Sequence, residues 1–216
     1  MRMLLAGLLV VVAACGRNEA QGEPAGALSG DDIAREQARF DAERKPEKVV
    51  EALALRPGSR VADIGAGSGL LTVHLARAVA PNGRVIATDI DGTVLDLLSQ
   101  RLKTVGLNDV VERRVVGAET PGLEDNQYDG ILLAEVDHYF EDPVLWMRTA
   151  ALALKPGGRL VISNRIYHKA QSMAAAKKAG LTLLSDSTPV PTHFIAIFVV
   201  PTASAPSSVI APEVKQ

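Results

Sequence analysis

The 216-residue sequence contains a single cysteine, Cys15, few aromatic residues (4%) and no long basic run. One cysteine excludes an intrachain disulfide and a zinc site built from several cysteines. The near balance of 23 basic and 25 acidic residues excludes a nucleic-acid clamp held by bulk charge, and the few aromatics argue against a base-stacking platform. With 47% hydrophobic and 22% charged residues, the composition is that of one folded domain.

The first residues have the pattern of an export signal. Arg2 supplies a positive charge, and the apolar run 4–12 is about half as long as a bilayer-spanning helix. The run Val12-Ala13-Ala14-Cys15-Gly16 resembles the lipobox of bacterial lipoproteins, which implies removal of residues 1–14 and lipidation of Cys15. A plain secretion signal is the alternative. Glycine rather than aspartate at position 16 favours the outer membrane, on its periplasmic face.

The rest of the chain divides into three predicted parts. Residues 15–30 are rich in Gly, Ala and polar residues without apolar periodicity, which predicts a flexible tether. Residues 31–200 are expected to fold as one domain. Residues 201–216 contain three prolines and several Ser and Thr residues, which predicts a disordered tail.

Short apolar runs alternate with amphipathic segments throughout the predicted domain. Two short helices open it, the first capped by Asp31 or Asp32 and the second beginning at Pro46. Strands are then expected at 60–64, 84–89, 110–116, 128–134, 159–163, 181–184 and 193–200. Helices are expected at 70–80, 94–105, 143–154 and 169–179. This alternation predicts a doubly wound α/β fold with a mostly parallel sheet, closed by an antiparallel pair.

Three glycines follow the first predicted strand at alternate positions, in the run Asp63-Ile64-Gly65-Ala66-Gly67-Ser68-Gly69. Glycine suits a backbone that turns sharply and lets a ligand approach. The dinucleotide fingerprint would need a glycine at position 70, which is Leu70, and the phosphate-binding P-loop would need a Lys followed by Ser or Thr. The run therefore predicts a cofactor loop that binds neither NAD nor ATP in those ways, with a plain tight turn as the alternative.

Asp89 ends the second predicted strand, about 20 residues beyond Gly69. A carboxylate at this place can accept hydrogen bonds from both hydroxyls of a ribose. The spacing therefore predicts a ligand that contains a nucleoside, and the alternative is that Asp89 caps the next helix.

Over about residues 46–200 the chain resembles class I S-adenosylmethionine-dependent methyltransferases. The run 61–69 is similar to the family's first motif, Thr88-Asp89-Ile90 to its second, and 154–160 to the turn before its fifth strand. The segment around Phe40 and Lys45-Pro46, with the run 135–140, further resembles a bacterial branch of mostly uncharacterised methyltransferases. The resemblance implies a Rossmann-like sheet of seven strands, the last antiparallel, with S-adenosylmethionine across the carboxyl ends of the first strands.

The resemblance also implies which residues contact the cofactor. The glycine loop (Gly65, Ala66, Gly67 and Gly69) would approach the methionine part, Asp63 would support its ammonium group, and Asp89 would hold the ribose. Ile90 would pack on adenine. The family often has an acidic residue before Ala-Glu to receive the adenine amino group, whereas this chain has Gly117 before Ala118 and Glu119. Glu135 would face the methionine end, and a purely structural role is an equally open alternative.

His138 is the candidate general base, because it follows the fourth predicted strand at the edge of the cleft. A histidine bonded to nearby backbone is the alternative. His74, His168 and His193 are scattered without ligand spacing and are interpreted as surface or satisfied core residues, so no metal site is predicted. The acceptor pocket is expected to be partly apolar, with Phe40, Tyr139, Phe140 and Tyr167 near it.

These patterns predict methyl transfer to a small-molecule acceptor. The predicted location conflicts with that activity, since S-adenosylmethionine is made in the cytoplasm. Either the export interpretation is wrong and the chain is cytoplasmic, or the chain is a lipid-anchored binding module without catalysis. Oligomeric state and the identity of the acceptor are not indicated by the sequence.

Overall fold

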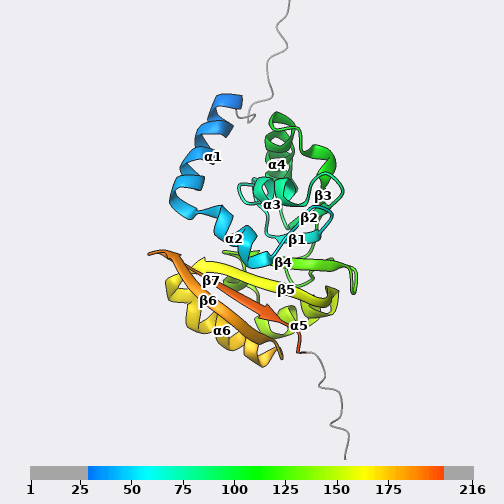
Figure 1. Cartoon of the computed structure of the whole chain (residues 1–216), viewed down its shortest axis with the longest axis vertical. Helices are drawn as coiled ribbons and strands as arrows, with labels where there is room; N and C mark the ends of the chain where they lie inside the picture. Colours follow the sequence, from blue (N-terminus) through cyan, green and yellow to red (C-terminus); the bar gives the residue numbers. More distant parts are fainter. Residues whose placement is uncertain (1–28, 202–216) are drawn as a thin grey trace, which may run out of the picture.

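The computed structural model describes residues 29–201 (Figure 1). The predicted signal peptide, Cys15 with most of the tether, and nearly all of the predicted tail lie outside the described residues. Within residues 29–201, no helix has the length and apolar character needed to cross a bilayer.

Six α-helices and seven strands alternate along the described chain. The helices are α1 (Gly30–Arg44), α2 (Pro46–Leu53), α3 (Thr72–Val79), α4 (Gly92–Thr104), α5 (Pro143–Ala153) and α6 (Lys169–Lys178). The strands are β1 (Arg60–Ile64), β2 (Arg84–Asp89), β3 (Val111–Val115), β4 (Tyr128–Ala134), β5 (Leu154–Arg165), β6 (Thr182–Val190) and β7 (His193–Val199). Single 3-10 turns lie at η1 (Asn108–Val110), η2 (Asp137–Tyr139) and η3 (Ile166–His168).

All seven strands form one sheet in the order β3-β2-β1-β4-β5-β7-β6. The pairs from β3 to β5 are parallel, whereas β7 runs antiparallel to both β5 and β6. The predicted fold class is confirmed, including the antiparallel last strand. Because β1 lies between β2 and β4, the chain leaves β1 toward one edge and later returns to its other side, which is the arrangement that opens a crevice at the carboxyl ends of the strands.

Helices cover both faces of the sheet (Figure 1). Neighbouring strand residues point to opposite faces, so Val61 packs with α2, α3 and α4 while Ala62 packs with α5 and α6. The same alternation occurs in β4, where Leu132 joins the first cluster and Ile131 and Leu133 join the second. Both faces of the central strands are therefore buried, which explains their continuous apolar sequence.

The first helix begins earlier than its predicted cap. Ser29, not Asp31 or Asp32, is the N-cap: its Oγ accepts a hydrogen bond from the backbone N–H of Asp32 (3.1 Å) and donates to Asp32 Oδ2 (2.6 Å). The Asp32 carboxylate thus fixes the orientation of the hydroxyl that caps the helix. The predicted caps are therefore wrong, because a carboxylate in the first turn was interpreted as the cap itself.

The end of the sheet also differs from the prediction. We expected a short strand at 181–184 followed by a loop containing Pro189, but β6 extends to Val190. A proline lacks the N–H that a central strand needs, yet β6 is an edge strand and its pairing with β7 is interrupted between Ser187 and Val190. The edge position therefore accommodates Pro189 within the strand. On β5, the predicted Lys155–Gly158 turn lies inside the strand as an irregularity of its pairing with β4.

Candidate active site

The glycine loop lies at the carboxyl end of β1 and has the backbone shape that its sequence predicts. Gly65, Gly67 and Gly69 have φ values of +65°, +54° and +87°, which residues with a Cβ rarely adopt. A Cβ on Gly69 would lie 2.1 Å from Cδ1 of Leu98 on α4, whereas a Cβ on Gly67 would meet nothing within 4 Å. Gly69 therefore allows α4 to pack against the loop, and Gly67 leaves the loop's backbone open to a ligand.

Asp89 links the end of β2 to this loop. Its Oδ2 accepts a hydrogen bond from the backbone N–H of Gly67 (2.9 Å), and its Oδ1 accepts one from the N–H of Asp91 (3.1 Å). Asp91, not Asp89, caps α4 by accepting from the N–H of Thr93 (2.8 Å). The capping alternative for Asp89 is therefore wrong, and its carboxylate lies between two strand ends where a ligand would lie.

Asp63 is a buried carboxylate beneath the loop. It is 2% exposed and accepts a hydrogen bond from Oγ1 of Thr72 (2.6 Å). Burial raises the pKa of Asp63 to about 6, against the opposing effect of the Thr72 hydrogen bond. A charge with so little solvation is stabilised by a cation placed nearby, so this position suits a positively charged ligand group.

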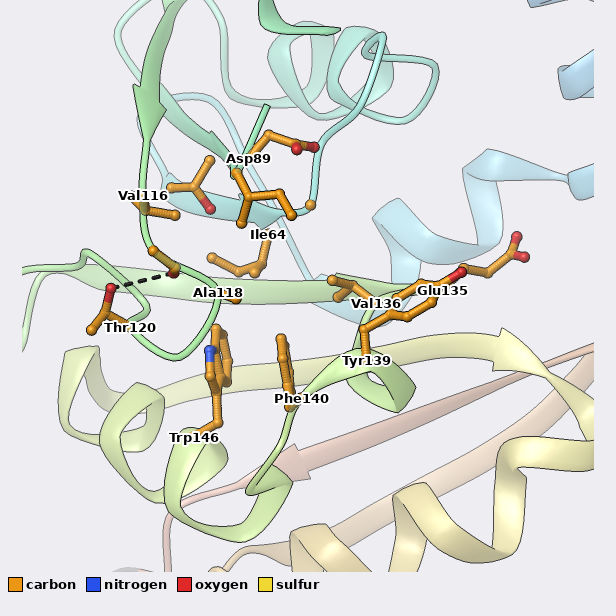
Figure 2. Close-up of a pocket in the computed structure, with 14 residues that line it drawn as sticks. Ile64, Asp89, Val116, Ala118, Thr120, Glu135, Val136, Tyr139, Phe140 and Trp146 are labelled. Atoms are coloured by element: carbon orange, nitrogen blue, oxygen red, sulfur yellow. Dashed lines mark hydrogen bonds between the residues drawn. The ribbon is translucent and has the colours of Figure 1, made fainter. Parts of the chain in front are cut away.

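Two cavities meet at this edge of the sheet. The larger cavity, of about 420 Å³, is bounded by the ends of β1 and β2, the loop after β3 and the start of α5 (Figure 2). Its walls include Asp89, Ile90, Ala118, Phe140 and Trp146. The smaller cavity, of about 170 Å³, is lined by Phe40, Arg44, Asp63, Glu135 and the glycine loop. Gly65 and Glu135 line both cavities, so the two cavities lie next to each other.

Glu135 is surrounded by three basic side chains from distant segments of the chain. It lies directly after β4 with φ of +53°, an uncommon value for a residue with a side chain. Its carboxylate pairs with Arg44 from the end of α1 and with Nε of Arg165 at the end of β5 (3.1 Å). Nε2 of His193 lies 3.3 Å from Oε1 of Glu135 without forming a hydrogen bond. Burial alone would raise the pKa of Glu135, but Arg44, His193 and Arg165 together outweigh it and lower that pKa.

Sequence reasoning did not identify Arg44, Arg165 or His193 as site residues. His193 was interpreted as a surface or satisfied core residue, and that interpretation is wrong, because it is 5% exposed and its Nε2 has no hydrogen-bond partner within the described chain. Arg165 and His193 are directly opposite each other on β5 and β7. Only the sheet pairing brings them to Glu135, and no sequence motif signals that pairing.

Arg101 joins the glycine loop to α1. Its guanidinium is 2% exposed, donates to the carbonyl oxygens of Ser68 (2.8 Å) and Ile33 (3.3 Å), and pairs with Glu36. It lies within an otherwise apolar stripe of α4. Arg101 at one end of α1 and the Arg44–Glu135 pair at the other hold this helix beside the smaller cavity.

A family model described as a methyltransferase domain matches residues 62–160 of this chain. A ubiquinone/menaquinone biosynthesis C-methyltransferase from Pseudomonas fluorescens (strain Pf0-1) is 36% identical over 152 residues, which cover 64% of this chain and 58% of that protein. The matched region thus spans less than two thirds of the curated relative. The matched domain and these relatives support the class I S-adenosylmethionine-dependent methyltransferase family.

Solved structures share the fold of this chain. A S-adenosylmethionine-dependent methyltransferase from Aquifex aeolicus has a TM-score of 0.68 at 21% identity, covering 80% of this chain and 98% of that one. A geranyl diphosphate C-methyltransferase from Streptomyces coelicolor A3(2), solved with S-adenosylhomocysteine, has a TM-score of 0.62 at 14% identity, covering 82% and 86%. The predicted family and fold are confirmed, and the predicted cofactor, S-adenosylmethionine, is the one this family uses.

Most of the predicted cofactor residues of this chain line the two cavities. Asp89, Ile90 and Ala118 line the larger cavity, and the glycine loop with Asp63 lines the smaller one. Ile90 is 65% exposed, so its side chain is free to cover a ligand ring. Glu119 does not line either cavity; its Oε1 instead accepts a hydrogen bond from the backbone N–H of Glu141 (3.1 Å).

His138 does not line either cavity. Oδ1 of Asn164 accepts from the N–H of Arg165 (2.7 Å) and its Nδ2 donates to Asp137 (2.7 Å), which sets the orientation of the amide. That Nδ2 also lies 3.0 Å from Nδ1 of His138, so Nδ1 accepts and a neutral ring carries its proton on Nε2. The prediction that His138 acts as a base therefore requires Asn164 to release Nδ1.

The remaining histidines have ordinary contacts. Nε2 of His74 lies 2.8 Å from Oδ1 of Asp41, and the ring of His168 stacks on that of His138 at a centroid distance of 4.2 Å. Burial, followed by the charge of His168, lowers the pKa of His138. Residues 29–201 contain no group of three or more His, Cys, Asp or Glu side chains placed to bind a metal.

Proposed function

We propose that this chain transfers the methyl group of S-adenosylmethionine to a small-molecule acceptor by direct in-line displacement. The observation that carries the proposal is the pair of cavities that meet at Gly65 and Glu135, with Asp89 beside one and buried Asp63 beside the other. A nucleoside carrying a charged amino-acid side chain has this division into a largely apolar part and an ionic part. The larger cavity also has a volume in the range of small-ligand sites.

When bound, S-adenosylmethionine supplies a methyl group that is already activated by the positive sulfur. Asp89 would accept hydrogen bonds from the ribose hydroxyls while the N–H of Gly67 keeps its carboxylate in place. Asp63 would stabilise the ammonium group from below the loop, and Ile90 and Ala118 would enclose the base. These roles use the chemistry that each side chain has in the structure.

The protein's contribution to the chemical step is placement. Holding a nucleophile in line with the methyl group at about 3 Å can contribute up to about 7–11 kcal/mol in ideal systems. The acceptor would lie near Gly65 and Glu135, where the cavities join, with Tyr139 at the rim (76% exposed). The Arg44–Glu135 pair at the end of α1 also lies beside this point.

The acceptor class is narrowed by the relatives and by the lining. The curated relatives are C-methyltransferases of ubiquinone and menaquinone biosynthesis, and one structural neighbour methylates carbon in geranyl diphosphate. The rim residues Phe40, Tyr139 and Phe140 are aromatic. We therefore propose an acceptor with an apolar ring or chain, and quinone-ring precursors are the first compounds to assay.

Calorimetry with the full chain tests cofactor binding. We expect S-adenosylhomocysteine to bind wild type. Asp89→Ala should weaken binding about 10- to 100-fold, because the ribose hydroxyls lose two charge-assisted hydrogen bonds to the Asp89 carboxylate. Asp91→Ala is the matched control, since Asp91 caps α4 and does not line either cavity. No binding to wild type, or equal binding by wild type and Asp89→Ala, would contradict the proposal.

An assay of methyl transfer distinguishes an enzyme from a ligand-binding module that does not catalyse a reaction. Labelled methyl groups from S-adenosylmethionine should appear in a small-molecule product when purified chain is added to a lipid extract of cells. Binding of the cofactor without any transfer, across extract and quinone precursors, would instead support the non-catalytic alternative.

We also propose that the chain is exported and lipid-anchored through Cys15, with the outer membrane as its location. The support is the sequence of residues 1–16 alone. Membrane fractionation of cells expressing wild type and Cys15→Ser tests this placement: wild type should sediment with envelope membranes, and the variant should be released. Recovery of both in the cytoplasm would favour a cytoplasmic enzyme with direct access to its cofactor.

A further inference from the structure

Trp146 forms a wall of the larger cavity. It lies in the first turns of α5, is 2% exposed, and stacks on Phe140 with a ring-centroid distance of 4.3 Å and an interplanar angle of 8°. Both rings line the cavity. In Figure 2 the two rings stand side by side beneath Ala118. Their position is explained by packing, because Trp146 belongs to the core cluster under β1 and β4.

Packing does not explain the indole nitrogen. Nε1 of Trp146 is buried without a hydrogen-bond partner in residues 29–201, and an indole N–H can only donate. Native structures seldom leave a buried donor unpaired. Oγ1 of Thr88, on β2, is a second buried polar atom without a partner, and Thr88 lines the same cavity. Both residues line one cavity, but the two atoms themselves are closed to solvent, so a ligand can pair with them only when the side chains that cover them shift.

The loop after β3 offers no side chain that is free to hydrogen-bond to such a ligand. Gly117 has none, Oγ1 of Thr120 donates to the carbonyl oxygen of Gly117 (3.3 Å), and Glu119 holds the backbone of Glu141. In Figure 2 the nitrogen of Trp146 is on the side of the ring that faces Thr120. The indole N–H is therefore the free polar side-chain group on this side of the larger cavity among the described residues.

We propose that the indole N–H of Trp146 recognises the purine of the cofactor by donating a hydrogen bond to one of its ring nitrogens. The inference rests on the proposed function and adds a specificity residue to it. Adenine has ring nitrogens that accept, at positions 1, 3 and 7, and an exocyclic amine that donates. An N–H group pairs with the ring nitrogens and not with the amine. Trp146 thus donates to a ring nitrogen of the base, which an ionised carboxylate cannot do because it has only acceptor atoms.

The test combines two variants of the full chain with altered ligands. Trp146→Phe keeps an aromatic ring against Phe140 and removes the N–H. Phe140→Leu is the matched control, because it alters the same wall without removing a donor. Affinities are measured by calorimetry for S-adenosylhomocysteine and for its 1-deaza, 3-deaza and 7-deaza analogues, in each of which a C–H group replaces one ring nitrogen. Thermal unfolding verifies that each variant is folded.

We expect wild type to bind one of the three analogues about three- to tenfold more weakly than S-adenosylhomocysteine, as loss of one hydrogen bond predicts. Trp146→Phe should weaken the parent ligand by a similar factor and show no further loss with that analogue. Phe140→Leu should weaken all four ligands equally. Because Trp146 is the only tryptophan of the chain, its fluorescence should also change when wild type binds the ligand.

Two results would overturn the assignment. If Trp146→Phe binds S-adenosylhomocysteine as tightly as wild type, or still discriminates against the same analogue, Trp146 does not read the base although the proposed function stands. If wild type does not bind S-adenosylhomocysteine, the proposed function fails and the Trp146 assignment fails with it. A Trp146→Phe variant that does not fold leaves the decision to wild type, in which equal affinity for all four ligands and unchanged fluorescence would overturn the assignment.

Discussion

The two sides of the candidate site are built differently. On the side of β1 and β2, the glycine loop and its carboxylates Asp63 and Asp89 lie within 27 consecutive positions, and Asp89 accepts a hydrogen bond from the loop at Gly67. On the side of β4, Glu135 is surrounded by Arg44, Arg165 and His193, which come from α1, β5 and β7. The first side is a local motif, and the second is assembled by the fold.

This difference determines how each side responds to mutation. In the local motif, backbone shape is essential, so changes to glycine should act through steric overlap. In the assembled cluster, charges from separate elements compensate one another, so removal of one charge should loosen contacts between elements. The following three experiments test that contrast, in order of decreasing expected effect.

Gly69→Ala should cause the largest loss of stability. Its Cβ would lie 2.1 Å from Leu98 Cδ1 at φ of +87°, and the two costs together amount to about 2–5 kcal/mol. Gly67→Ala, with φ of +54° and open space, should cost only about 1–2 kcal/mol but weaken cofactor binding. Urea unfolding measures both. Equal losses of stability would show that packing of α4 against the loop does not matter.

Asp63→Asn should stabilise the chain at neutral pH and weaken cofactor binding. Burial raises the pKa of Asp63 to about 6 from 3.8, so the folded state binds a proton more tightly than the unfolded state does. Wild-type stability should therefore fall as pH rises from about 4 to about 6, by at most about 3 kcal/mol. The variant should lack this decrease. Unfolding measured between pH 4 and pH 8 tests it, and parallel profiles would contradict the predicted burial cost.

Glu135→Gln should cost about 1–3 kcal/mol at neutral pH, because it leaves Arg44 and Arg165 without their partner. The pKa of Glu135 is lowered in the fold, so its contribution is present above the carboxyl group's ordinary pKa and is lost as pH falls. Wild type and variant should converge in acid. Glu51→Gln, which removes an exposed partner of Lys48, is the control and should cost about 0.5 kcal/mol or less. Equal effects of the two variants would refute the assembled cluster.

The same contrast explains how much could be predicted from sequence. The positions of Gly65, Gly67, Gly69 and Asp89 follow from a strand, a turn and a spacing, and all of these are visible in the sequence. The alternation of helices and strands predicts a mostly parallel sheet covered on both faces, although it does not give the order of the strands. His193 could not be assigned to the site, because its approach to Glu135 depends on the pairing of β7 with β5.

Two other features were missed for related reasons. Trp146 lies in an apolar helix pattern, which predicts a core residue, and only the structure reveals that its nitrogen has no partner. Pro189 predicts a loop unless the strand is known to lie at an edge of the sheet, and sequence spacing does not indicate which strand does. Local chemistry was therefore predictable, whereas properties that depend on neighbours distant in sequence were not.

The attachment of α1 has a consequence for exchange of ligands with solvent. Ile33 is the one residue of this 15-residue helix that is fully buried, and its other anchors are ionic or polar contacts of Arg101, Arg44 and Asp41. Dissolved salt weakens ionic contacts more than apolar burial where their charges reach solvent, as Glu36 and Asp41 do in two of these pairs. Higher ionic strength should therefore accelerate the entry and release of a ligand at the smaller cavity, while the melting temperature of the domain stays nearly constant.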